Sequence, residues 1–128
     1  MFQSLEVFKI SSAMASHAAT RQAVIATNMA NADTPGYVAR DIADFKTALD
    51  AAGDGTSMRA TRTGHLSGGL GMHELSPQNA ATPENPNGNA VSIEEEMVKA
   101  VNTQRQHERA LAVYKSSLTI LRSVVGRG

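Results

Sequence analysis

Two long segments with helical patterning lie at opposite ends of this 128-residue chain, and a turn closes the first of them. No glycine or proline interrupts the chain between about residues 4 and 31. Pro35 disfavours helical geometry at Thr34 and lacks an amide proton, whereas Gly36 is free to adopt a positive φ. The pattern therefore predicts a helix over about residues 4–31 that is closed by a turn at residues 34–37.

Apolar side chains along the first segment recur at intervals of three, four and seven residues. They are Val7, Ile10, Met14, Ala18, Ile25 and Met29. This spacing is typical of an amphipathic helix with a narrow apolar stripe. At about 1.5 Å per residue the helix spans roughly 40 Å, which is more than a compact domain of this size can cover. We therefore expect it to protrude or to pair lengthwise with another helix.

The C-terminal segment carries its own start signal. Ser92 is followed three residues later by Glu95, which is the spacing of a capping box, and Glu94 and Glu96 complement the positive end of the helix dipole. The three carboxylates are consecutive and point in different directions around a helix, so capping explains them better than a catalytic or metal site. We predict a helix that starts at Ser92.

A heptad pattern runs along this second helix. Its positions are Met97, Gln104, Leu111, Leu118 and Val125, with Val101, Tyr114 and Leu121 between them. Such a stripe is typical of a coiled-coil seam, and the polar stretch 102–109 within it favours a particular neighbour over maximal burial. A four-helix bundle remains an alternative. The two helices together predict an assembly seam made of Val7, Ile10, Met14, Ile25, Met29, Met97, Val101, Leu111, Tyr114, Leu118 and Leu121.

The middle of the chain has a different composition. Residues 53–90 are rich in Gly, Pro, Asn, Ser and Thr, a mixture that cannot build a core, so the segment is either disordered alone or ordered by partners. A short helix is predicted near 41–52, where apolar residues recur at helical spacing before Gly53. The chain thus divides into residues 1–34, a variable region 35–90 with a flexible loop over 53–90, and residues 91–128.

Composition excludes several classes of function. The net charge is zero and the sequence pI is about 6.9, so no basic surface suggests nucleic acid or an anionic membrane. The chain has no cysteine, no run of apolar residues long enough to cross a membrane and no cleavable signal peptide. No nucleotide-binding loop, nucleophile elbow or metalloprotease motif occurs. We expect neither an enzyme nor a cofactor; a small metal enzyme using His65 and His73 is the weakest alternative.

The stretch Asn28-Met29-Ala30-Asn31-Ala32-Asp33-Thr34-Pro35-Gly36-Tyr37 resembles the N-terminal signature of bacterial flagellar axial proteins. The turn motif comprises Asn28, Asn31, Asp33, Thr34, Pro35, Gly36 and Tyr37. The continuation Ala39-Arg40-Asp41-Ile42, residues 58–66 and residues 87–91 resemble the proximal, B-type rod subunits within that family. Ala43 stands as an insertion against the family pattern, and His107 stands where the family has an aromatic residue.

The resemblance implies a mainly α-helical structural subunit whose terminal helices pair antiparallel, as a coiled coil or helical bundle. It implies self-assembly with other rod subunits into the rod that crosses the periplasm, contacts with the membrane ring and the ring–rod adaptor, and export by the flagellar type III apparatus without a cleaved signal. No membrane insertion and no nucleic-acid partner are expected. The alternative from the residues alone is a generic helical adaptor or secretion accessory protein that forms a discrete oligomer.

Overall fold

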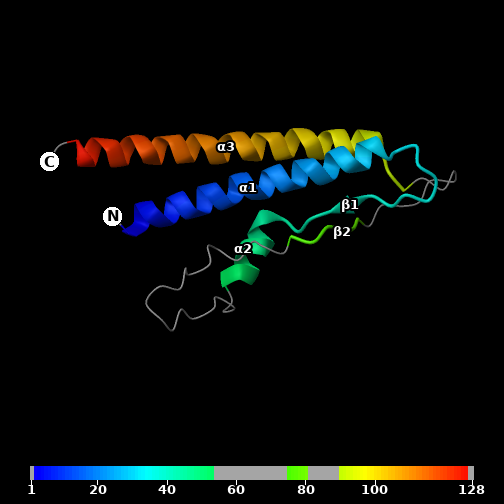
Figure 1. Cartoon of the computed structure of the whole chain (residues 1–128), viewed down its shortest axis with the longest axis horizontal. Coiled ribbons are helices and arrows are strands. Elements are labelled where there is room, and N and C mark those ends of the chain that lie inside the picture. Colours follow the sequence, from blue (N-terminus) through cyan, green and yellow to red (C-terminus); the bar gives the residue numbers. More distant parts are fainter. Residues whose placement is uncertain (1, 54–74, 81–89, 127–128) are drawn as a thin grey trace.

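The computed structural model describes residues 2–53, 75–80 and 90–126. In chain order the elements are α1 (Phe2–Ala30), β1 (Arg40–Asp41), α2 (Phe45–Gly53), β2 (Gln78–Asn79) and α3 (Ile93–Val125). Figure 1 shows α1 and α3 lying side by side in opposite directions, with both termini at one end of the molecule. The predicted pairing of two long antiparallel helices is therefore confirmed. The predicted Gly- and Pro-rich loop lies mostly outside the described residues, as do His65 and His73.

The turn after α1 has the geometry that its sequence predicts. The amide of Tyr37 donates to the carbonyl of Thr34 at 3.2 Å, and Gly36 adopts a φ of 75°. Proline at the second position and a glycine with positive φ at the third define a type II turn. A side chain at Gly36 would meet no neighbour, so the requirement for glycine there comes from the backbone angle alone.

The start of α3 is also confirmed. Ser92 is the N-cap, and its hydroxyl oxygen accepts a hydrogen bond from the amide of Glu95 at 3.4 Å. The same hydroxyl donates to the Glu94 carboxylate at 3.1 Å. The acidic first turn places negative charge where the helix dipole is positive, which stabilises this end of the helix.

The contact between α1 and α3 is built from small and polar side chains. The buried residues of α3 repeat every seven positions and are Glu96, Thr103, Ala110 and Ser117. Buried residues at the same interval on α1 are Ser11, Ala18 and Ile25. Small side chains let two helix backbones approach closely, but they bury little apolar surface. The pair is therefore narrow, and only Ile25 among these residues is large and apolar.

Beyond the turn the chain returns along α1. β1 pairs antiparallel with β2, with Arg40 opposite Asn79, and Val38 forms a parallel bridge to Ala90. These strands are too short to leave a period in the sequence, and sequence reasoning did not predict them. A small apolar cluster of Ala32, Ala39 and Val91, with Tyr37 and Ala80 packed against it, fills the space between the turn and the start of α3.

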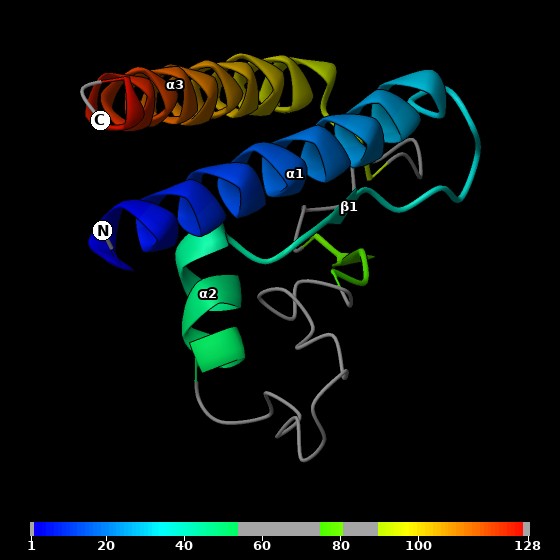
Figure 2. The ribbon, with the colours of Figure 1, turned by 60° about the vertical axis from the view of Figure 1, so that its left-hand side comes forward.

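The short helix α2 begins later than predicted. The pattern favours a helix near 41–52, whereas α2 begins at Phe45. The difference arises at Asp41, whose carboxylate accepts the amide of Ile42 at 2.8 Å and so holds this stretch in a non-helical form. Figure 2 shows α2 projecting from the helix pair. Its first residue, Phe45, packs edge-on against His17 of α1 with ring centres 5.6 Å apart, so α2 is attached to α1 by its first turn.

Candidate assembly interface

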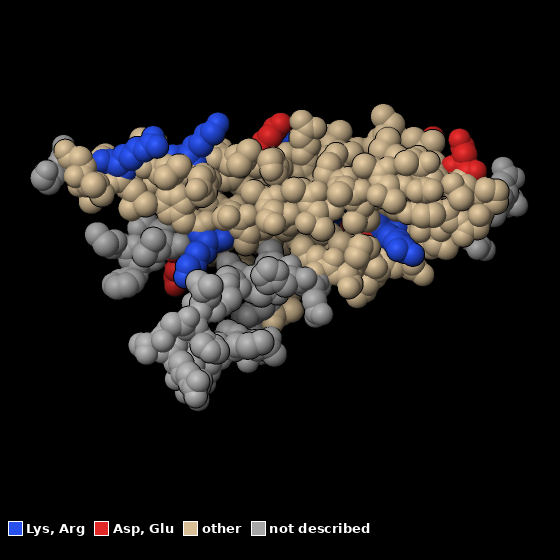
Figure 3. Space-filling view, in the orientation of Figure 1, with Lys and Arg blue, Asp and Glu red and all other residues tan. Residues whose placement is uncertain are grey.

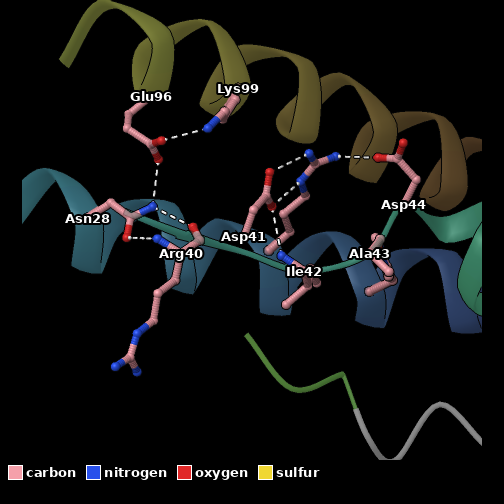
Figure 4. Close-up of polar contacts among 10 residues, drawn as sticks. Asn28, Arg40, Asp41, Ile42, Ala43, Asp44, Glu96 and Lys99 are labelled. Atoms are coloured by element: carbon pink, nitrogen blue, oxygen red, sulfur yellow. Dashed lines mark hydrogen bonds and ion pairs between the residues drawn. The ribbon is translucent and has the colours of Figure 1, made fainter. Parts of the chain in front are cut away.

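Asn28 is the junction between the turn motif and both long helices (Figure 4). Its side chain is fully buried. The amide nitrogen donates to the Arg40 carbonyl at 2.6 Å and to the Glu96 carboxylate at 3.0 Å. The amide oxygen accepts from the Arg40 amide at 3.0 Å and from the Tyr37 hydroxyl at 3.2 Å. These four bonds use the full hydrogen-bonding capacity of an asparagine side chain.

Glu96 lies at the α1–α3 contact and not on the solvated surface. Its side chain is 2% exposed, and the carboxylate accepts from Lys99 at 2.8 Å as well as from Asn28. A buried carboxylate is tolerated only when it is paired and hydrogen-bonded. Capping and the helix dipole therefore account for the exposed Glu94 and Glu95, but the same interpretation is incomplete for Glu96. The sequence pattern did not indicate which of the three consecutive glutamates would be buried against α1.

A second polar contact ties the return segment to α1. The guanidinium of Arg21 donates two hydrogen bonds to Asp41, each at 2.9 Å, and a third to Asp44 at 3.2 Å. The hydrogen bonds that Arg21 donates to Asp41 raise the pKa of Arg21 despite the opposing effect of burial. Burial acts to raise the pKa of Asp41, but the hydrogen bonds and charge of Arg21 outweigh it and hold that pKa below its ordinary value.

This ion pair predicts an acid-dependent loss of stability. Because the folded-state pKa of Asp41 is lowered from 3.8, its contribution is present above that pH and is lost as the pH falls through the folded value. Asp41→Asn should remove about 1 kcal/mol at neutral pH, after allowance for solvent screening, and flatten the pH dependence below about pH 4. Urea unfolding between pH 2 and 7 measures both effects, with Asp50→Asn on the exposed side of α2 as the control. Parallel curves for wild type and Asp41→Asn would contradict this role.

The turn motif divides into buried and exposed members. Asn28 is buried, Tyr37 is partly buried through its contact with Asn28, and Asn31 bonds the carbonyl of Thr27 at 2.8 Å. The hydroxyl of Thr34 donates to Asn31 at 3.3 Å. Asp33, Thr34, Pro35 and Gly36 are exposed. The motif thus shapes the chain through its turn and through Asn28.

The residues of the predicted assembly seam lie mainly on the outside of the helix pair. Ile25 is buried, and Met14, Leu118 and Leu121 are partly buried. The exposed members are Val7, Ile10, Met29, Met97, Val101, Leu111 and Tyr114, with exposed fractions from 37% to 55%. Figure 3 shows a long surface over both helices on which charged side chains are sparse. The exposed seam residues of α3 therefore form an apolar flank of that helix, and the seam as a whole does not fill the interior of the pair.

The phase of the two heptads explains this arrangement. The apolar positions Met97, Leu111 and Leu118 each follow a buried position by one residue. One residue is a rotation of about 100° around a helix, so the apolar heptad faces sideways from α1. Near the end of the pair that carries both termini, α1 also contributes to this flank, since the rings of Phe8 and Tyr114 pack edge-on with centres 5.1 Å apart. The second heptad of α3, which consists mostly of small residues, was not predicted from the sequence, because a search for large apolar residues does not reveal it.

His17 is a packed imidazole. Its Nε2 lies 2.7 Å from the carbonyl of Ala43, and its ring contacts Phe45. Its Nδ1 is buried without a partner among the described residues. Within residues 2–53, 75–80 and 90–126, no three histidine or acidic side chains gather as metal ligands would, and no helix is long and apolar enough to cross a membrane.

Comparison with known proteins agrees with this architecture. Residues 11–37, which span most of α1 and its turn, match the family described as flagella basal body rod protein. The class defined by the paired helices and the turn is thus that of flagellar rod proteins, which are structural proteins and not enzymes.

Full-length relatives narrow the class further. The rod protein FlgB of Agrobacterium fabrum is 33% identical over 123 residues, covering 89% of this chain and 88% of the relative. FlgB of Escherichia coli is 32% identical, with 86% of each chain covered, and FlgB of Salmonella typhimurium is 29% identical with the same coverage. The chain belongs to the FlgB family of flagellar basal body rod proteins. Its place is accordingly the flagellar basal body, and its role is that of a structural rod subunit.

Proposed function

We propose that this chain assembles with copies of itself and with other rod subunits into the proximal part of the rod, the drive shaft that crosses the periplasm and is needed for motility. In this proposal its neighbours include the membrane ring and the ring–rod adaptor. The chain reaches them through the flagellar type III export apparatus without a cleaved signal peptide. The family membership supports the rod itself, and the surface of the helix pair supports the mode of assembly.

The observation that carries the proposal is the inverted distribution of side chains on the helix pair. Small and polar residues face inward, whereas large apolar residues such as Met97, Val101 and Leu111 are exposed. Contiguous exposed apolar surface marks protein–protein contact sites. Contacts between two different faces of identical subunits generate helical assemblies when the rotation between neighbours does not close into a ring. A subunit of this kind completes its core only when neighbours cover the apolar flank.

Fractionation of purified basal bodies tests this proposal against the adaptor alternative. A rod subunit should co-purify with basal bodies after detergent extraction and acid treatment of the cells' flagella, and antibody labelling should place it between the rings. A helical adaptor or secretion accessory protein should instead sediment as a discrete oligomer and be absent from the purified structures. Finding the chain only in the soluble oligomer would contradict the rod proposal.

The turn provides a further prediction. Replacing Pro35-Gly36 by Ala-Ala removes the residue pre-set for the turn and puts a side chain where φ is 75°, at a cost of about 1–2 kcal/mol. We expect export at the normal level and loss of assembly, because Tyr37 and the return segment are misdirected. Secreted protein in the medium and rods in electron micrographs measure the two outcomes. Normal rods in this variant would remove the turn from the assembly mechanism.

A further inference from the structure

The contact between α1 and α3 contains little that distinguishes one register from another. The facing residues repeat every seven positions on both helices and are mostly small. Sliding α3 by seven residues, about 10 Å, brings small residues opposite small residues again. An interface of this kind permits close packing, but it specifies the axial alignment of the helices only weakly.

One pair of side chains breaks this repeat. Asn28 and Glu96 are 0% and 2% exposed and are joined by a 3.0 Å hydrogen bond across the helix contact (Figure 4). No other member of the buried heptad on α3 carries a charge, since the following positions are Thr103, Ala110 and Ser117. A slip of seven residues that brings Thr103 opposite Asn28 would leave the Glu96 carboxylate without a partner on α1. The opposite slip would bring Glu96 level with Arg21, whose guanidinium is already held by Asp41 and Asp44.

We propose that the Asn28–Glu96 pair is a register latch that selects one axial alignment of the two helices. Buried polar pairs have this use in coiled coils, where they fix the register at some cost in stability. Asn28 is well suited to it, because its other three hydrogen bonds hold it against Arg40 and Tyr37. The latch therefore also joins α3 to the turn motif.

The latch has a consequence for the outer surface. The edge-on contact between Phe8 and Tyr114 lies at the other end of the helix pair. Between this contact and the Asn28–Glu96 pair, α1 advances by twenty residues and α3 by eighteen. A slip of seven residues would separate these rings and change which apolar side chains lie together on the flank. The effect on rod assembly rests on the proposed function, whereas the register itself is a property of the isolated chain.

Cysteine crosslinking tests the latch, because the natural chain has no cysteine to interfere. The Phe8–Tyr114 and Asn28–Glu96 contacts together place Ser11 of α1 at the level of about residue 111 of α3. A disulfide between Ser11→Cys and Ala110→Cys therefore reports the observed register. Ser11→Cys with Thr103→Cys, or with Ser117→Cys, reports a slip of one heptad in either direction. In the otherwise natural chain, only the Ala110 pair should form a disulfide efficiently.

Glu96→Leu removes the latch with an apolar side chain of similar size. We expect the ratio of slipped to native crosslinks to rise on the order of tenfold or more, while circular dichroism still shows the helices. Glu96→Gln, whose amide oxygen can still accept from Asn28, should keep the native ratio. Glu95→Leu, at an exposed position on the same turn, is the matched control and should leave the ratio unchanged.

Two results would overturn the latch. An unchanged ratio in Glu96→Leu would assign the register to the Val38–Ala90 bridge and the apolar cluster around Val91. Loss of helix in Glu96→Leu would show that Glu96 is needed for folding and not for the choice of register. Either result leaves the rod assignment intact, since the crosslinks are measured on the isolated chain, whereas failure of the rod proposal appears only in the basal-body fractionation.

Discussion

Leu111→Asp is expected to abolish incorporation of the subunit into rods, and with it motility, without unfolding the chain. Leu111 is 39% exposed on the apolar flank, so a carboxylate there is solvated in the free subunit. In the assembled rod the same carboxylate would be buried without a partner, at a cost on the order of 3–5 kcal/mol for each contact. Complementation of a deletion strain, scored by swimming and by rods in purified basal bodies, measures the effect. Leu118→Asp should act in the same direction.

Ser116→Asp is the matched control for this experiment. Ser116 is an exposed polar residue of the same helix, and it lies away from the apolar heptad. We expect near-normal rods and swimming, with an effect on folding within about 0.5 kcal/mol. Equal loss of assembly in Ser116→Asp and Leu111→Asp would refute the apolar flank as the specific contact surface.

Ala110→Leu is expected to give the largest loss of stability among apolar substitutions on α3. Ala110 is 1% exposed at the contact with α1, where the backbones approach over small side chains. Three additional carbon atoms have no space there, so the free energy of unfolding should fall by about 1–3 kcal/mol. Thermal unfolding followed by circular dichroism measures this change.

Ala112→Leu separates overpacking from any general effect of leucine in the helix. Ala112 is exposed two residues further along α3, so leucine there contacts solvent and changes helix propensity only slightly. We expect stability within about 0.5 kcal/mol of the natural chain. A tolerated Ala110→Leu would show that the helices pack less closely than the buried heptad indicates.

Much of the fold could be predicted because its signals are local. The end of α1 depends on Pro35 and Gly36, and the start of α3 depends on Ser92, so each boundary is encoded within a few residues. Lengthwise pairing was one of the two outcomes that the length of the terminal helices allowed, since a helix of roughly 40 Å is longer than a compact domain of this size can cover. The family signature in the turn added the direction of the pairing.

The interior of the helix pair could not be predicted in the same way. Sequence patterns identify a seam by its large apolar residues, and here those residues lie outside while Ala18, Thr103 and Ala110 lie inside. The burial of Glu96 depends on Asn28, which is 68 residues away in the sequence. The β1–β2 pairing also joins distant segments of only two residues each. Contacts of this kind are determined by the assembled fold and leave no local period.

If this chain is a structural subunit of the proximal rod, as we propose, loss of its gene should remove the rod. Electron microscopy of basal bodies from the source bacterium with this gene deleted, beside a complemented strain, tests it most directly. We expect membrane rings without rods, hooks or filaments in the deletion strain, and complete structures after complementation. Intact rods and filaments in a deletion strain that carries no second copy of the gene would contradict the account.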